Sequence, residues 1–186
     1  MDNLNTYIDH TLLKPEATSE QVVKLCKEAT ENEFKAVCIN PHYIELAAKE
    51  LFGSSTKVCT VIGFPLGANQ TRVKVYETEK AIEAGADEID MVLNIGELKT
   101  GNLEFVKEDI NAVLKAAKAQ EKLLKVIFET SKLSNEEIKS ACLICKDLNV
   151  DFVKTSTGFG GGGATIEHVK LMRETVGPEM GVKASG

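Results

Sequence analysis

The stretch VDFVKTSTG, residues 150–158, has the pattern of a short buried strand with one lysine, Lys154, near its carboxyl end. A glycine-rich turn, residues 158–163, follows directly. Desolvating an ammonium group is costly, so a lysine inside a strand indicates a chemical role. Burial lowers the pKa of a lysine, and the neutral amine is a nucleophile. The stretch therefore predicts Schiff-base chemistry on a carbonyl compound.

A second lysine, Lys183, occupies a similar position in MGVKASG, residues 180–186. If the two ammonium groups converge on one site, each lowers the pKa of the other, and we expect a depressed pKa for Lys154. Asp90 lies between Ile89 and Met91 in another apolar run, so its side chain is expected inside the protein. It is either a structural partner for a lysine or a general acid/base, and the sequence does not separate these roles.

Short apolar or β-branched runs alternate with helical patterns along the chain. This alternation predicts a parallel sheet with right-handed helical crossovers. No Pro/Ser-rich linker or low-complexity tract divides the sequence, so a single domain is expected over residues 1–186. The apolar runs are residues 7–13, 36–40, 57–64, 88–94, 124–130, 151–157 and 181–185.

Polar residues within these runs help to decide between two folds. An open doubly wound sheet and a (β/α)8 barrel both fit the alternation, and both bury their strands on two faces. An open sheet could hide one or two polar strand residues, whereas a barrel gives all of them a shared interior and a site at its carboxyl-end mouth. We therefore predict an α/β fold, a TIM (β/α)8 barrel, with the sequence ending at about the seventh strand. The polar residues are Asp9, Asn40, Asp90, Lys125, Glu129, Lys154 and Lys183.

The composition excludes several classes of protein. A net charge of −6 argues against a general nucleic-acid binder, which needs a basic face. No apolar run approaches the roughly 18–20 residues needed to span a bilayer. Five cysteines without a signal peptide indicate a cytoplasmic protein in a reducing environment.

Other motifs have less specific interpretations. Cys142 and Cys145 match a Cys-x-x-Cys pattern, but both fall on the apolar stripe of a predicted helix, which favours core packing over zinc or redox chemistry. The three histidines show no metal-ligand spacing. The glycine run at 158–163 could hold a phosphate through backbone N–H groups, form a mobile lid, or be a plain turn.

Six motifs in order along essentially the whole chain resemble the deoxyribose-phosphate aldolase family. They are DHTLLKP (residues 9–15), AVCINP (36–41), VIGFPLG (61–67), EIDMV (88–92), FVKTSTGF (152–159) and VKASG (182–186). The resemblance implies a TIM barrel and a class I aldolase, a lyase that needs no metal or other cofactor. The implied reaction is the reversible cleavage of 2-deoxy-D-ribose 5-phosphate to acetaldehyde and D-glyceraldehyde 3-phosphate in deoxyribose phosphate catabolism. The implied partners are a small phosphorylated sugar, aldehydes and a possible homodimer mate, without nucleic acid or membrane.

The resemblance also implies roles for particular residues. Lys154 would form the Schiff base, and Lys183 would be the neighbouring cation that keeps the Lys154 amine neutral and relays protons. Asp90 would be the acid/base partner, working with Lys183 and a water. Five residues would line the pocket and two glycines would belong to the phosphate site: Asp9, Thr11, Cys38, Lys125 and Thr155, then Gly158 and Gly186.

Two departures from the family pattern carry expectations. Gly160 and Gly161 stand where many relatives have small polar residues, which would loosen the phosphate loop. The family also continues beyond the position of Gly186 with a helix, an eighth strand and further phosphate-binding residues. A shortened chain, a tail beyond residue 186, or a gene fragment would each explain this difference. A chain that ended here would be expected to have poor stability, open sheet edges that favour oligomerisation, and weak phosphate binding.

Three alternatives to the aldolase remain open at this stage. A catalytically impaired barrel fragment with a structural or assembly role would keep the residues without turnover. A different phosphosugar barrel enzyme could be an isomerase with Glu129 as its base, or a metal-dependent aldolase, although no His/carboxylate metal set is present in the sequence. A redox role for Cys142 and Cys145 is the weakest of the three.

Overall fold

The computed structural model describes residues 4–186, in which parallel strands follow one another in strict sequence order. Each strand pairs with its neighbours in the chain, giving the order β1-β2-β3-β4-β5-β6-β7. The strands are β1 (Asp9–Leu12), β2 (Ala36–Ile39), β3 (Lys57–Ile62), β4 (Glu88–Val92), β5 (Leu123–Ile127), β6 (Phe152–Lys154) and β7 (Gly181–Lys183). Each strand overlaps one of the seven predicted runs, and each run extends beyond the carboxyl end of its strand.

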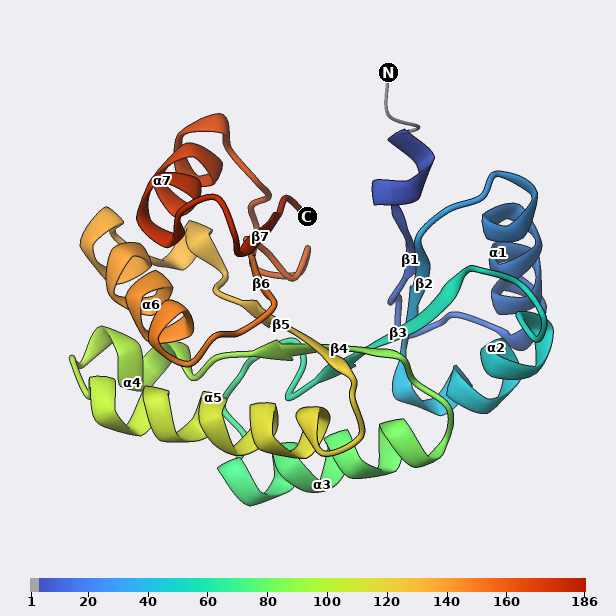
Figure 1. Cartoon of the computed structure of the whole chain (residues 1–186), viewed down its shortest axis with the longest axis horizontal. Helices are drawn as coiled ribbons and strands as arrows, with labels where there is room; N and C mark the ends of the chain where they lie inside the picture. The colour runs from blue at the N-terminus through green and yellow to red at the C-terminus, as the bar shows by residue number, and fades with distance from the viewer. Residues whose placement is uncertain (1–3) are drawn as a thin grey trace.

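The helices cover the outer, convex side of this sheet (Figure 1). They are α1 (Ser19–Glu31), α2 (Ile44–Glu50), α3 (Thr71–Glu83), α4 (Ile95–Lys99), α5 (Leu103–Lys118), α6 (Asn135–Asp147) and α7 (Ile166–Val176), with short 3-10 turns η1 (Leu4–Tyr7), η2 (Pro41–Tyr43) and η3 (Thr130–Lys132). Thr18 and Ser134 start α1 and α6 with capping boxes, which satisfy the free N–H groups of the first turn. None of the helices in residues 4–186 is long and apolar enough to cross a membrane.

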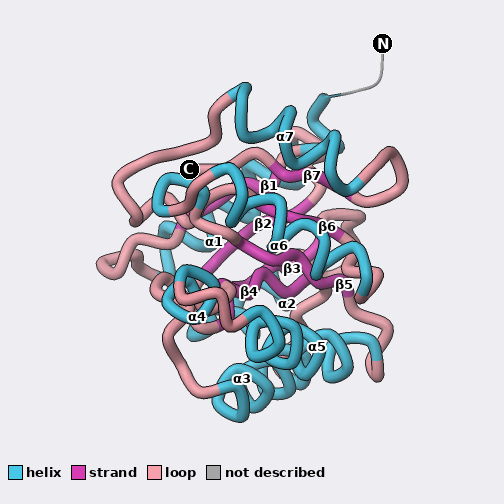
Figure 2. Tube along the Cα trace, turned by 90° about the vertical axis from the view of Figure 1, so that its left-hand side faces the viewer, coloured by secondary structure: helices cyan, strands magenta, loops and turns pink. Residues whose placement is uncertain are grey.

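The sheet curls, so that β1 and β7 approach each other from its two ends (Figures 1 and 2). Within residues 4–186, β1 pairs only with β2 and β7 only with β6. The predicted α/β barrel is therefore confirmed as a curled parallel half-barrel that ends near a seventh strand, and the open doubly wound sheet is wrong.

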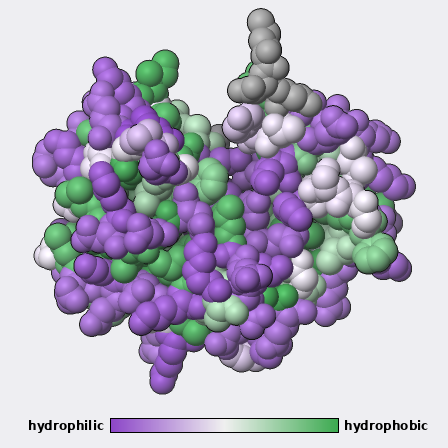
Figure 3. Space-filling model, in the orientation of Figure 1, coloured by the Kyte–Doolittle hydropathy of each residue, from purple (hydrophilic) through white to green (hydrophobic). Residues whose placement is uncertain are grey.

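Strand alternation separates an apolar outer layer from a polar interior. In β4, Ile89 and Met91 pack in the main core against the helices, whereas Asp90 lies on the inner face beside the small apolar cluster of Ala36, Cys38, Cys59 and Val61. Both layers are buried. In the view of Figure 3 the outer surface is mostly hydrophilic, with scattered hydrophobic residues. The buried polar residues of the inner face are therefore the candidates for a functional site.

Candidate active site

A chain of paired charges occupies the interior of the curled sheet. Lys154 Nζ donates to Asp90 Oδ2 at 2.6 Å, and Lys125 Nζ donates to Asp90 Oδ1 at 2.8 Å. Lys125 Nζ also lies 3.8 Å from Asp9 Oδ2, and Lys183 Nζ lies 2.8 Å from the same oxygen. The groups run without a break from Lys154 through Asp90, Lys125 and Asp9 to Lys183. This arrangement brings the three predicted catalytic residues into one network.

The network is held by register and by charge balance. Lys154 and Lys183 are directly paired positions of β6 and β7, and Asp90 is paired with Lys125 across β4 and β5. Glu88 completes the set, because Lys125 Nζ donates to Glu88 Oε2 at 2.6 Å. Three lysines face three carboxylates, so the formal charges cancel. This cancellation offsets part of the cost of burying six charged groups.

The electrostatics of Lys154 differ from the expectation drawn from the sequence. Burial lowers the pKa of Lys154, but the adjacent Asp90 carboxylate outweighs burial and raises the pKa above its ordinary value. Burial similarly raises the pKa of Asp90, and Lys125 and Lys154 together reverse that effect and hold it low. The predicted depression of the Lys154 pKa by Lys183 is therefore wrong for this arrangement, because each lysine has its own carboxylate.

A cavity of about 540 Å³ opens above this network, at the carboxyl ends of β1, β6 and β7. Both lysines line this cavity. Lys154 is 6 % exposed and the Lys183 side chain is 19 % exposed, so both are largely shielded from solvent. Of the residues predicted for the site, six line this cavity: Asp9, Thr11, Lys154, Gly158, Lys183 and Gly186. A larger cavity of about 770 Å³ lies near Arg173 and Met180 and contains none of these lysines.

Three of the predicted pocket residues lie elsewhere. Lys125 is buried in the charge network and lines a second cavity, of about 550 Å³, which also contains Glu88 and Lys35. Cys38 is buried in the inner apolar cluster. Thr155 is buried, and its hydroxyl and Ser185 Oγ lie 3.3 Å apart, so it joins the ends of β6 and β7. Cys38, Lys125 and Thr155 are therefore not among the residues that line the cavity containing Lys154, and their contact with substrate stays a prediction.

Two features of the site were missed by sequence reasoning. Glu88 was not among the predicted site residues, yet it is buried and paired with Lys125. Its spacing of two from Asp90 places both side chains on one strand face, which was a usable signal. Phe64 and Phe159 both line the cavity and pack edge to face with ring centroids 5.4 Å apart. They come from loops far apart in the sequence, so no local pattern indicated this pairing.

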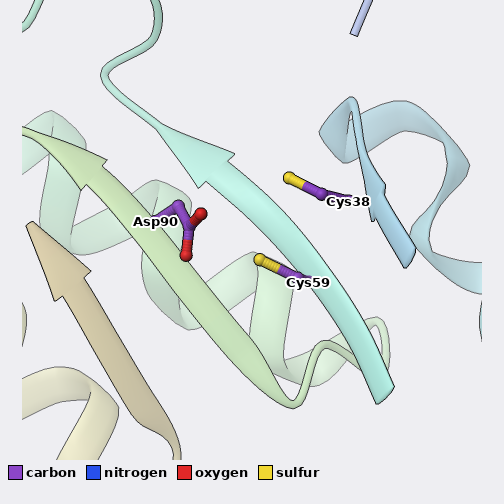
Figure 4. Close-up of side chains that lie close together, drawn as sticks. All are labelled: Cys38, Cys59 and Asp90. Atoms are coloured by element: carbon purple, nitrogen blue, oxygen red, sulfur yellow. The ribbon is translucent and has the colours of Figure 1, made fainter. Parts of the chain in front are cut away.

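Cys38, Cys59 and Asp90 form a possible metal-ligand set on the inner face. Figure 4 shows the three side chains on adjacent strands β2, β3 and β4, and their ligand atoms lie within 4.8 Å of one another. Both Asp90 oxygens, however, already accept bonds from lysine ammonium groups. Burial also raises the pKa of the Cys59 thiol, which opposes the thiolate that a metal requires. The charges at this place favour the lysine–carboxylate network over a metal ion.

A curled parallel barrel with a buried lysine at its carboxyl-end cavity defines a barrel enzyme of the kind that acts through a lysine amine. Residues 4–186 match the family described as DeoC/LacD family aldolase, and the chain belongs to this family.

Curated relatives are similar in sequence to this chain over almost its entire length. The deoxyribose-phosphate aldolase of Streptococcus gordonii is 61 % identical over 183 residues, covering 98 % of this chain and 82 % of the relative. That of Clostridium perfringens strain 13 is 63 % identical over 179 residues, covering 96 % of this chain and 80 % of the relative. A tetrameric deoxyribose phosphate aldolase from Aeropyrum pernix superposes with a TM-score of 0.91 at 34 % identity, covering 98 % of this chain and 77 % of that one.

Proposed function

We propose that this chain is a class I aldolase that reversibly cleaves 2-deoxy-D-ribose 5-phosphate to D-glyceraldehyde 3-phosphate and acetaldehyde, as part of deoxyribose phosphate catabolism. The observation that carries the proposal is the buried Lys154–Asp90 pair at the wall of the carboxyl-end cavity. Family membership and the names of the close relatives support the same reaction.

Lys154 is the proposed nucleophile. Its amine adds to the C1 carbonyl of the open-chain sugar, and the carbinolamine loses water to give an iminium ion. The C3 hydroxyl then gives up its proton, the C2–C3 bond breaks, and its electron pair forms an enamine with the iminium nitrogen as electron sink. Protonation of C2 and hydrolysis release acetaldehyde and restore Lys154.

Asp90 and Lys183 are the proposed proton carriers. Asp90 Oδ2 contacts Lys154 Nζ directly, which places it to exchange protons with that amine, while the resting pair keeps the proton on Lys154. Lys183 reaches the same cavity and connects to Asp90 through Asp9 and Lys125. Lys183 therefore supplies a second proton-carrying group at the cavity, beside the Lys154–Asp90 pair.

The phosphate end of the substrate is proposed to lie at the glycine-rich side of the cavity, where Gly158 and Gly186 both have left-handed backbone conformations. Lys14 lines the same cavity and has no ion-pair partner within residues 4–186, unlike Lys154 and Lys183. An unneutralised cation near exposed backbone N–H groups favours a dianionic substrate.

We also propose that the enzyme works in the cytoplasm with small phosphorylated sugar and aldehyde partners, and as a homodimer. All five cysteines are free and buried, which supports a reducing compartment.

An assay of 2-deoxy-D-ribose 5-phosphate cleavage tests the proposal. A coupled dehydrogenase that reduces the released aldehydes provides the readout. The parent enzyme should produce both aldehydes in equal amounts, and Lys154→Met should lose activity by at least about 10³-fold. Lys80→Met, at an exposed lysine of α3, serves as the matched control. Parent protein that is folded but releases no aldehyde would favour the structural barrel fragment instead.

A further inference from the structure

Glu129 is a buried carboxylate that the proposed chemistry does not use. It follows β5 directly and is 3 % exposed. Its backbone is left-handed, with φ 58° and ψ 60°, a conformation that is uncommon for a residue other than glycine. Glu129 is not among the residues lining the Lys154 cavity, so the isomerase base considered from the sequence is not supported. An unusual backbone conformation at a buried charge calls for a specific partner.

That partner is the start of the glycine-rich loop. Glu129 Oε2 accepts hydrogen bonds from the Thr157 hydroxyl and from the Thr157 backbone N–H, the latter at 3.3 Å. The Thr157 hydroxyl oxygen in turn accepts a bond from the Phe159 backbone N–H at 3.0 Å. One carboxylate oxygen thus fixes two backbone positions on either side of Gly158.

The loop also rests on the Glu129 turn by close contact. A Cβ added at Gly160 would clash with the Glu129 carboxylate, and one added at Gly162 would lie 2.8 Å from Ser131 Cβ. The absence of a side chain at Gly160 therefore leaves room for the Glu129 carboxylate beneath the loop. Gly161, by contrast, has open space around its Cβ position and a φ of 82°.

The fixed segment forms one wall of the cavity. Thr157, Gly158 and Phe159 line it, opposite Ser185 and Gly186 at the end of β7. Glu129 itself stays behind this wall, so its negative charge does not face the cavity. Because Glu129 contacts the side of the loop that faces away from the cavity, it can orient the backbone N–H groups of the loop without repelling an anion in the cavity.

We propose that Glu129 is the positioning residue of the phosphate site. Its carboxylate fixes the Thr157 and Phe159 backbone so that the neighbouring N–H groups of Gly158 and Gly160 receive the 5-phosphate. This proposal rests on the aldolase function proposed above. It makes phosphate recognition, rather than Schiff-base formation, depend on Glu129.

Steady-state kinetics with 2-deoxy-D-ribose 5-phosphate and with unphosphorylated 2-deoxy-D-ribose separate these two roles. Glu129→Ala should raise KM for the phosphorylated sugar about tenfold or more, while kcat/KM for 2-deoxyribose changes less than about threefold. Glu129→Gln keeps the shape and one acceptor oxygen, so it should give a smaller rise in KM. Glu136→Gln, at an exposed glutamate of α6, is the matched control and should leave both substrates unchanged.

Calorimetric titration with inorganic phosphate makes the test independent of turnover. Glu129→Ala and Thr157→Val should each weaken phosphate binding, and the double variant should be no weaker than the worse single variant. Borohydride trapping with acetaldehyde should proceed at the parent rate in all of them. Two results would overturn the proposal. One is an equal loss of kcat/KM for the phosphorylated and unphosphorylated sugars, and the other is unchanged phosphate binding in Glu129→Gln and Glu129→Ala. Parent protein that binds phosphate but cleaves no sugar would instead count against the aldolase function.

Discussion

Asp90 is the residue on which the proposed chemistry depends most, because it contacts both buried lysines of the inner face. Its two oxygens accept from Lys125 and Lys154 at 2.8 and 2.6 Å. The same contact that makes Asp90 a proton acceptor also raises the Lys154 pKa and keeps the resting amine protonated. Nucleophilic attack and ion pairing therefore compete for the same nitrogen, Lys154 Nζ.

Asp90→Asn separates these two effects. Without the carboxylate, burial dominates and the Lys154 pKa should fall, so borohydride trapping with acetaldehyde should persist and its pH profile should shift to lower pH. Turnover of the phosphorylated sugar should drop by about 10²–10⁴-fold, because the proton acceptor is lost. Trapping rates measured across a pH series check the shift, and a profile displaced to higher pH would contradict the assigned electrostatics.

Lys183→Leu tests whether this lysine tunes Lys154 or carries protons. Lys183 is paired with Asp9 and not with Asp90, so its removal should leave trapping by acetaldehyde within a few-fold of the parent enzyme. Turnover should fall by about 10²-fold or more because the relay is broken. Lys170→Leu, at an exposed lysine of α7, is the control. Loss of trapping in Lys183→Leu would show that Lys183 sets the Lys154 pKa after all.

The sequence predicted Lys154, Lys183 and Asp90 as neighbours because polar residues in doubly buried strands have few other places to go. It did not predict Glu88, or that Lys154 pairs with Asp90 while Lys183 pairs with Asp9. Those depend on strand register, in which Asp90 faces Lys125 and Lys154 faces Lys183, and register is a property of the folded sheet. The Glu129 contact depends on two loops meeting, which local patterns do not encode.

At the scale of elements, helix packing contains a second buried ion pair. Lys74 of α3 donates to Asp109 of α5 at 2.6 Å and to the Val92 carbonyl at 3.1 Å, and both charged side chains are fully buried. Burial lowers the Lys74 pKa despite Asp109, so desolvation exceeds the benefit of pairing. The pair therefore adds more to the fixed position of α3 and α5 than to net stability.

Asp109→Leu should reduce the free energy of unfolding by about 3–5 kcal/mol, because it leaves the Lys74 ammonium buried and uncompensated. The double variant Lys74→Met/Asp109→Leu should recover most of that loss. Urea unfolding of the three proteins provides the measurement, and Lys80→Gln, at an exposed pair, should change stability by less than about 1 kcal/mol. A double variant as unstable as Asp109→Leu would mean that the pair is itself a main source of stability.

The strands could be predicted because short apolar runs recur along the chain with helical patterns between them. The short helix α4 and the three 3-10 turns were not predicted, since segments of three to five residues carry too little periodicity. The choice of a barrel over an open sheet came from the expected inner-face polar residues. The curled sheet confirms the barrel, although Asn40 and Glu129 follow β2 and β5 and are not strand residues.

For the whole molecule, the interior charge network makes stability depend on pH. The Asp90 pKa is held below its ordinary value of 3.8, so its contribution to stability is fully present above that value and is lost as pH falls through the lower folded value. The unfolding free energy should therefore drop on acidification below about pH 4, by up to about 1.4 kcal/mol per pH unit for this group. In Asp90→Asn the unfolding free energy, measured by urea unfolding at each pH, should fall less steeply below about pH 4. An equally steep fall would contradict the assignment of this pH dependence to Asp90.

The measurement that tests the central claim most directly is borohydride trapping with acetaldehyde, read by intact mass and peptide mapping. The structure places Lys154 at the cavity wall with Asp90 in contact, so we expect a reduced two-carbon adduct on Lys154 and none on Lys154→Met. Folded parent protein with no adduct, or with the adduct on Lys183, would contradict the assignment of Lys154 as the Schiff-base residue.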